Sequence, residues 1–228
     1  MLYHAKDLTM EIHAAYRLYS HAVRAKLIKP SVATLNSQAE ALEDALIDIG
    51  SWYKDNGHTK VINAFMPACK TLVELFGYTP YVGNVYRIVQ NLPENLAEKL
   101  SEGSKLTLRT GLNPLQSWSA SQSGALYFYL NHQFAVNTTL VRLISSGNQV
   151  ASTEWLLSVV DYMKSFGTKL STNLRADALR YLEKQLLDFA REDEVVMLLP
   201  KDAKVEVMAL LNWPDKRKIV RTKNALSR

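Results

Sequence analysis

Residues 189–194 read Phe-Ala-Arg-Glu-Asp-Glu and run directly into residues 195–199, which read Val-Val-Met-Leu-Leu. Side chains alternate across an extended segment, so we expect Glu192 and Glu194 on the same side at the start of a buried strand. Two carboxylates side by side lower the stability of the folded protein. Proteins usually keep such a pair where a carboxylate meets a developing positive charge or polarises a hydroxyl. Taken alone, such a stretch is more often a charged loop at a strand entrance.

The composition predicts one sizeable globular domain, or a domain with a smaller helical lobe. The chain has 228 residues, of which 47% are hydrophobic and 21% charged. The single cysteine, Cys69, excludes an internal disulfide and fits a reducing cytoplasm, where we expect a buried, inert thiol. We expect a cytoplasmic protein without membrane contact, because no apolar run approaches roughly 18 residues and the first dozen residues lack a secretory core.

The net charge of +5 is concentrated in a basic tail, residues 216–228. This tail could contact nucleic acid or an acidic partner, and a solvated terminus is the alternative. The five histidines are scattered and no cysteine cluster is present, so the sequence predicts no metal site. It also contains no glycine-rich phosphate loop of either common pattern.

Hydrophobic periodicity divides the chain into helices followed by a mixed region. The predicted helices span residues 10–19, 39–49, 59–76, 94–100, 125–130, 153–166 and 176–190, with Ser31 as a plausible N-cap. The predicted strands span residues 84–89, 105–108, 114–119, 138–144, 195–199 and 204–211. We therefore predict an α+β fold with a helical N-terminal lobe (residues 1–80), a mixed core of strands and helices (81–215) and the basic tail.

Polar side chains interrupt two of the predicted strands. Arg87 lies within an apolar strand, where a guanidinium must find an anion such as phosphate or carboxylate. A salt bridge with a nearby acid is the structural alternative. Ser117 and Ser119 share one side of a strand and could hold a carboxylate or a ribose hydroxyl, although serines at a strand end more often cap the next helix.

An arginine, a serine pair and a carboxylate pair, in that order and each on a strand, are what a nucleotide-sugar site needs. The arginine grips the diphosphate. The carboxylate binds a ribose hydroxyl and stabilises an oxocarbenium-like transition state, as in glycoside cleavage.

On these residues the chain resembles the arginine–serine–glutamate class of mono-ADP-ribosyltransferases, found in bacterial toxins and bacteriophages. The resemblance implies an ADP-ribosyltransferase-like split β-sheet core behind the helical lobe. The sequence departs from the family at Ile88, where many phage members have glycine, at Trp118, where threonine is commoner, and in the charges of Arg191 and Asp193. The matching segments are residues 53–63 (ending Ile-Asn), 85–87, 117–119, 125–128 (Ala and Phe at its ends) and 189–194.

The resemblance also implies a role for each matched residue. Glu194 would be the catalytic carboxylate, Glu192 would orient or deprotonate the acceptor, and Arg87 would hold the NAD phosphates or ribose. Ser117 would position Glu194. The resemblance further implies NAD contacts from Ser119, from Phe128 stacking near the nicotinamide, and from Asn63 in the helical lobe; a core aromatic and a helix-surface amide are the alternatives for the last two.

The implied activity is transfer of ADP-ribose from NAD, a substrate, to an arginine of host proteins with release of nicotinamide and without a metal. The expected setting is the bacterial cytoplasm, with a phage-encoded enzyme acting on host transcription or translation proteins. Two alternatives stay open from the residues: a non-catalytic basic protein that binds nucleic acid or protein, and a transferase acting on nucleic acid.

Overall fold

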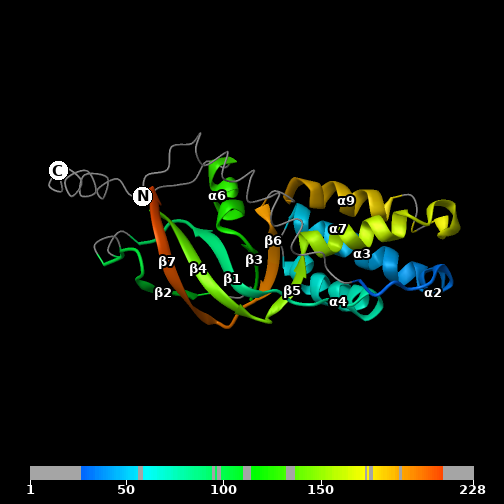
Figure 1. Ribbon diagram of the computed structural model, residues 1–228, viewed down its shortest axis with the longest axis horizontal. Helices are drawn as coiled ribbons and strands as arrows, with labels where there is room; N and C mark the ends of the chain where they lie inside the picture. Colours follow the sequence, from blue (N-terminus) through cyan, green and yellow to red (C-terminus); the bar gives the residue numbers. More distant parts are fainter. Residues whose placement is uncertain are drawn as a thin grey trace.

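The computed structural model describes residues 27–212 apart from 56–58, 94–95, 97–98, 110–113, 132–136, 173, 175–176 and 190–191. The predicted helix at 10–19, much of the one at 94–100 and the basic tail lie outside the described residues. Helices gather at one end of the molecule and a curved antiparallel sheet at the other (Figure 1). This arrangement confirms the α+β class and the helical N-terminal region predicted from the sequence.

The helical end combines segments from both halves of the chain. Ser31 caps the first described helix, as predicted, because its Oγ accepts a hydrogen bond from the backbone N–H of Thr34 at 3.1 Å. The helices are α2 (Val32–Ser37), α3 (Ala39–Lys54), α4 (Thr59–Phe76), α7 (Thr153–Lys164), the short 3₁₀ helix η1 (Gly167–Lys169) and α9 (Ala178–Phe189).

Within the described residues the sheet has seven strands in the order β2-β7-β4-β1-β3-β6-β5, and every neighbouring pair is antiparallel. The strands are β1 (Val82–Val89), β2 (Lys105–Arg109), β3 (Leu115–Ser119), β4 (Thr138–Ser146), β5 (Gln149–Ser152), β6 (Glu194–Leu198) and β7 (Asp202–Asn212). The sequence did not predict β5, because four residues are too short to show an alternating pattern.

The sheet is split between β1 and β3. A single register pair, Tyr86 with Ser119, joins these two strands, whereas all of β1 is in register with β4. Helix α6 (Gln122–Asn131) follows β3 and packs over the junction, where its apolar side chains meet those of β1.

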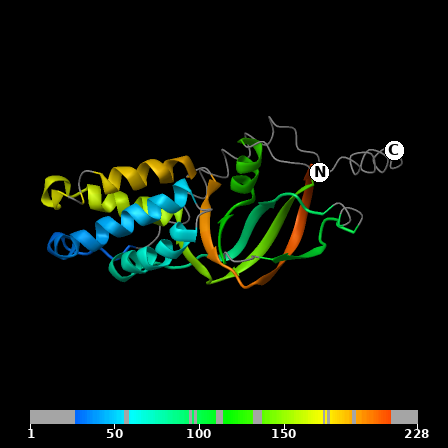
Figure 2. The same ribbon diagram turned by 180° about the vertical axis from the view of Figure 1, so that it is seen from behind.

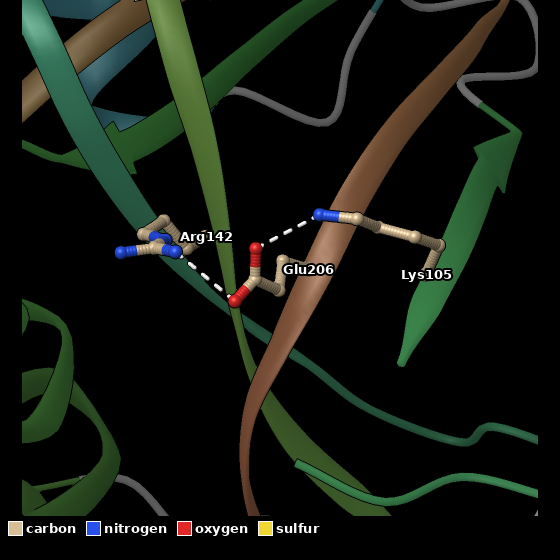
Figure 3. Close-up of polar contacts among 3 residues, drawn as sticks. All are labelled: Lys105, Arg142 and Glu206. Atoms are coloured by element: carbon tan, nitrogen blue, oxygen red, sulfur yellow. Dashed lines mark hydrogen bonds and ion pairs between the residues drawn. The ribbon is translucent and has the colours of Figure 1, made fainter. Parts of the chain in front are cut away.

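Ion pairs link three neighbouring strands in the outer part of the sheet. Glu206 of β7 accepts hydrogen bonds from Lys105 of β2 at 2.8 Å and from Arg142 of β4 at 3.0 Å (Figure 3). These two cations lower the pKa of Glu206. Register pairs carry the same transverse row onward from Arg142 through Tyr86 and Ser119 to Glu194, so the row crosses six strands.

The main hydrophobic core joins the helices to one edge of the sheet. Its buried side chains come mainly from α2, α3, α4, α7 and α9, together with Leu115 of β3, Ala151 of β5 and Val196 of β6. Seen from behind, α9, α3 and α4 stand beside β6 and β5 (Figure 2). The helices of residues 153–189 therefore pack against those of residues 32–76, although the two groups lie far apart in the sequence.

Cys69 lies in this core, as the sequence predicted, and burial raises the pKa of its thiol. Within the described part of the chain, no helix has the length and apolar character needed to cross a membrane.

Candidate active site

A pocket of about 240 Å³ lies at the split between β1 and β3. Six of the seven residues that the sequence singled out line it: Arg87, Ser117, Ser119, Phe128, Glu192 and Glu194. The seventh, Asn63, is exposed on α4 and does not line the pocket. The structure therefore gathers the proposed arginine, serines and glutamates at one place, and leaves Asn63 outside it.

Glu194 is the first residue of β6 and is almost completely buried, with 4% of its surface exposed. It lies opposite Ser119 in the register of β3 and β6. The hydroxyl of Ser117, two residues earlier on β3, donates a hydrogen bond to Glu194 Oε1 at 2.8 Å. The serine thus holds the carboxylate in the way that the sequence resemblance implies for this pair.

Arg87 is held by neutral oxygen acceptors. Its Nη1 donates to Gln116 Oε1 at 2.9 Å and to the carbonyl oxygen of Ser117 at 3.1 Å. Burial lowers the pKa of Arg87 and the nearby Glu194 raises it, and an arginine keeps its charge under such conditions. Among the described residues Arg87 forms no ion pair within 4.0 Å, so the salt-bridge alternative finds no partner there.

The two glutamates have strongly perturbed acidities. Burial raises the pKa of Glu194 to about 7, against the lowering effects of the Ser117 hydrogen bond, of Arg87 and of Trp52. Burial and the neighbouring Glu194 charge raise the pKa of Glu192 to about 8. Both carboxyl groups therefore titrate near neutral pH, within the range that acid–base catalysis uses.

The segment after β3 holds in place the acidic loop, residues 192–193, which leads into β6. The backbone N–H of Ala120 donates to the carbonyl oxygen of Asp193 at 2.9 Å, and the Ser121 hydroxyl donates to the Asp193 carboxylate. The Ser119 hydroxyl lies within hydrogen-bond distance of the carbonyl oxygens of Ser121 and Glu192. Asp193 has a φ of 48°, a left-handed conformation that aspartate tolerates better than most residues.

Glycine is required where α6 passes this loop. A methyl group on Gly124 would overlap the backbone carbonyl of Glu192 and the Ser119 hydroxyl. The Ser121 hydroxyl also accepts a hydrogen bond from the Gly124 N–H at 3.0 Å, as a cap does at the start of a helix.

The sequence reading missed the roles of Gln116, Ser121, Asp193 and Gly124. The serine before a helix is a recognisable capping signal and could have revealed Ser121. Nothing in the local sequence indicates that Gln116 meets Arg87, because the two lie on different strands.

Aromatic side chains form the apolar wall of the pocket. Phe128 comes from α6, lines the pocket and also packs against the small core around Ile88, so the core-aromatic alternative holds in part and stacking on nicotinamide stays a prediction. Phe189, at the end of α9, packs on Tyr53 of α3 with ring centroids 5.4 Å apart. No group of three His, Cys, Asp or Glu side chains suited to a metal ion occurs within the described ranges.

No protein-family model matches the chain, and no curated protein matches its sequence. Among solved structures, the ADP-ribosyltransferase Vis in complex with agmatine aligns with 92% of this chain and 80% of its own, at 14% identity and a TM-score of 0.36. The Vis toxin structure from Vibrio splendidus aligns with 94% of this chain and 83% of its own, at 13% identity and a TM-score of 0.36. A TM-score at this level assigns no function.

Proposed function

We propose that this protein is an NAD-dependent mono-ADP-ribosyltransferase. The observation that carries the proposal is the meeting of Arg87, Ser117 and Glu194 in one pocket, with the serine bonded to the glutamate. These residues come from three different strands and match the order of the arginine–serine–glutamate motifs in the sequence. Glu192 adds a second carboxyl group on the wall of the same pocket.

The size of the pocket suits one end of a dinucleotide. Its 240 Å³ falls just below the range of about 300–1,000 Å³ that whole drug-sized ligands occupy. The nicotinamide riboside end of NAD would fill it, with the nicotinamide ring against Phe128. Arg87, at the pocket wall, would attract the negatively charged diphosphate.

In the proposed reaction the bond between ribose C1′ and the nicotinamide nitrogen breaks, and nicotinamide leaves with the bonding electron pair. Positive charge develops on the ribose, where ionised Glu194 would stabilise it through the charge and through a hydrogen bond from a ribose hydroxyl. The acceptor nitrogen then forms a bond to C1′ and loses a proton. Ser117 would keep the carboxylate directed at the ribose.

The second carboxyl group favours a positively charged acceptor. With a pKa of about 8, Glu192 is largely protonated at neutral pH, and an approaching guanidinium would favour its ionised form. Ionised Glu192 would orient the guanidinium and take the proton that it loses. We therefore propose protein arginine as the acceptor, and by the sequence resemblance host transcription or translation proteins in the bacterial cytoplasm.

A binding protein without catalysis is the rival candidate. The basic tail that favoured it lies outside the described residues. Two carboxyl groups whose pKa values are raised by burial cost stability, and a protein that only binds nucleic acid gains nothing from them.

The test is to incubate the protein with labelled NAD and a bacterial lysate, beside two variants. Glu194→Gln keeps the shape of the side chain without its charge, and we expect it to reduce labelling at least about a hundredfold. Glu40→Gln, on the exposed first turn of α3, is the matched control and should label like the unmodified protein. Equal labelling by all three proteins, or none by any, would overturn the enzymatic proposal.

The acceptor is tested separately. We expect Glu192→Gln to lose transfer to arginine while slow NAD hydrolysis continues, since the first step needs only Glu194. Simultaneous loss of both activities would contradict the separate role of Glu192. Label that resists protease but not nuclease would move the acceptor to nucleic acid.

A further inference from the structure

The guanidinium of Arg87 reaches across the split in the sheet to β3. Apart from the register pair Tyr86–Ser119, the described residues of β1 and β3 form no strand pairing with each other. At this place β3 accepts two hydrogen bonds from Arg87 Nη1: the carbonyl oxygen of Ser117 accepts at 3.1 Å and the side-chain oxygen of Gln116 accepts at 2.9 Å. Two consecutive residues of β3 therefore hold one arginine of β1.

Gln116 lies behind Arg87 and outside the pocket. Arg87 and Ser117 line the pocket, whereas Gln116 is not among the described residues that do. Side chains alternate along a strand, so the Gln116 side chain leaves β3 on the face opposite to that of Ser117. On this face Gln116 is in register with Met197 of β6, which is fully buried. Any effect of Gln116 on a bound ligand therefore passes through Arg87.

The two groups that hold Arg87 are neutral, so they orient the guanidinium without offsetting its charge. Within the described part of the chain, Arg87 forms no ion pair within 4.0 Å. Both of its side-chain hydrogen bonds to described residues leave from Nη1, and a guanidinium has further donors on Nε and Nη2. A planar guanidinium that is held at one nitrogen can present the other two to a phosphate group, which accepts paired hydrogen bonds.

We propose that Gln116 is a positioning residue, which directs Arg87 towards the diphosphate of NAD and leaves the charge of Arg87 available to that diphosphate. This inference rests on the proposed function, because it takes NAD as the ligand of the pocket. A carboxylate at position 116 would accept the same hydrogen bond, but it would offset the positive charge that the diphosphate needs. An apolar side chain would leave the charge and remove the anchor.

The first test measures the binding of ADP-ribose by calorimetry and needs no catalysis. We expect Gln116→Glu to bind ADP-ribose at least about tenfold more weakly, because the new carboxylate repels the diphosphate through the nearby Arg87. Gln116→Met keeps the length of the side chain and removes the acceptor. It should weaken binding about tenfold, as expected for one lost hydrogen bond to a charged group. If either folded variant binds as tightly as the unmodified protein, the inference is overturned.

Thermal denaturation shows whether the variants are folded at the temperature of the assay. Gln116→Glu preserves the shape of the side chain and the hydrogen bond to Arg87, so it tests the proposal even if Gln116→Met unfolds. Gln38→Glu is the matched control. It makes the same change of charge at an exposed residue between α2 and α3, at the end of the helical lobe away from the sheet (Figure 1), and should bind ADP-ribose like the unmodified protein.

The second test separates binding from chemistry in an assay of NAD hydrolysis. We expect Gln116→Met to raise KM about tenfold and to change kcat less than about twofold, because the diphosphate is bound equally before and during the reaction. A fall in kcat at an unchanged KM would overturn the proposed role, since it would mean that Gln116 acts on the chemical step and not on the diphosphate.

The binding test also distinguishes this inference from the proposed function. If the unmodified protein binds no ADP-ribose, the proposed NAD site and the role of Gln116 both fail. If the unmodified protein binds ADP-ribose and the two Gln116 variants bind it equally well, the NAD site stands and only the role of Gln116 is overturned.

Discussion

At the scale of single residues, the site is dominated by carboxyl groups that are hard to ionise. Burial raises the pKa of Glu194, and burial together with the Glu194 charge raises the pKa of Glu192. Hydrogen bonds and Arg87 counteract this only for Glu194, which fits its proposed charged role. Burying these carboxyl groups lowers the free energy of unfolding, by an amount that depends on pH.

We predict that Glu192→Gln stabilises the protein at pH 8.5 relative to pH 5. Glu192 ionises near pH 4.5 in the unfolded chain and near pH 8 when folded, so its burial costs nothing below pH 4.5 and most above pH 8. The neutral amide removes this cost, by on the order of 2 kcal/mol at pH 8.5, because solvent screens the half-buried group in part.

Urea denaturation of both proteins at the two pH values measures this difference, and pH-independent effects of the substitution cancel in it. A stability gain that is the same at pH 5 and pH 8.5, or larger at pH 5, would show that the carboxyl is not held protonated by burial.

At the scale of elements, the acidic loop depends on β3 and α6. Ser119, Ala120 and Ser121 engage the backbone or side chains of residues 192–193, and Gly124 leaves the space that the loop occupies. The two carboxylates are therefore placed by a segment some 70 residues earlier in the sequence, as the Ser119–Glu192 separation of 73 residues shows. A loop so held needs no large change to present both groups to a ligand.

Gly124→Ala should displace this loop. The added methyl group meets backbone atoms of Glu192, which yield less easily than a side chain, so we expect a loss of about 1–3 kcal/mol in stability. We also expect a fall in NAD hydrolysis of more than tenfold, since misplacement by about 1 Å suffices for such losses. Thermal denaturation and a hydrolysis assay measure the two effects.

Leu130→Ala, on the exposed part of the same helix, is the control and should change neither quantity appreciably. If Gly124→Ala were as stable and as active as the unmodified protein, the close packing of α6 on the loop would not hold in solution.

At the scale of the whole molecule, the helices and the sheet share one core. Leu182 of α9 is fully buried in the same cluster as Val196 of β6, so neither part encloses its apolar surface alone. The lobes are for this reason expected to unfold together.

Leu182→Ala should cost about 2–5 kcal/mol, the usual range for a buried leucine. It should lower the urea concentration at which half of the protein is unfolded by the same amount for α3 and for β6. Hydrogen exchange, measured in peptides from each element, reports the two midpoints. Leu187→Ala, on the exposed side of the same helix, is the matched control. Protection of β6 that survives the loss of α3 would contradict a shared core.

Most elements of this fold could be predicted from the sequence because their patterns are local. The strands around Arg87 and Ser117, and the helices at residues 39–49 and 59–76, carry periodicities of two or 3.6 residues that the structure reproduces. Strand β5 escaped because it is short, and Gln116 and Gly124 escaped because their roles depend on partners from other elements.

The sequence by itself determined which reactive side chains this protein contains and their order along the chain. The arginine, the serines and the glutamates are recognisable as motifs. Only the tertiary structure decided that β3 lies between β1 and β6, which brings Ser117 to Glu194 across 77 residues and leaves Asn63 outside the pocket. It also decided that Glu194 is buried, which raises its pKa to about 7. The physical reason is that strand register, burial and the pKa of a buried group depend on every neighbour at once, and no local pattern encodes them.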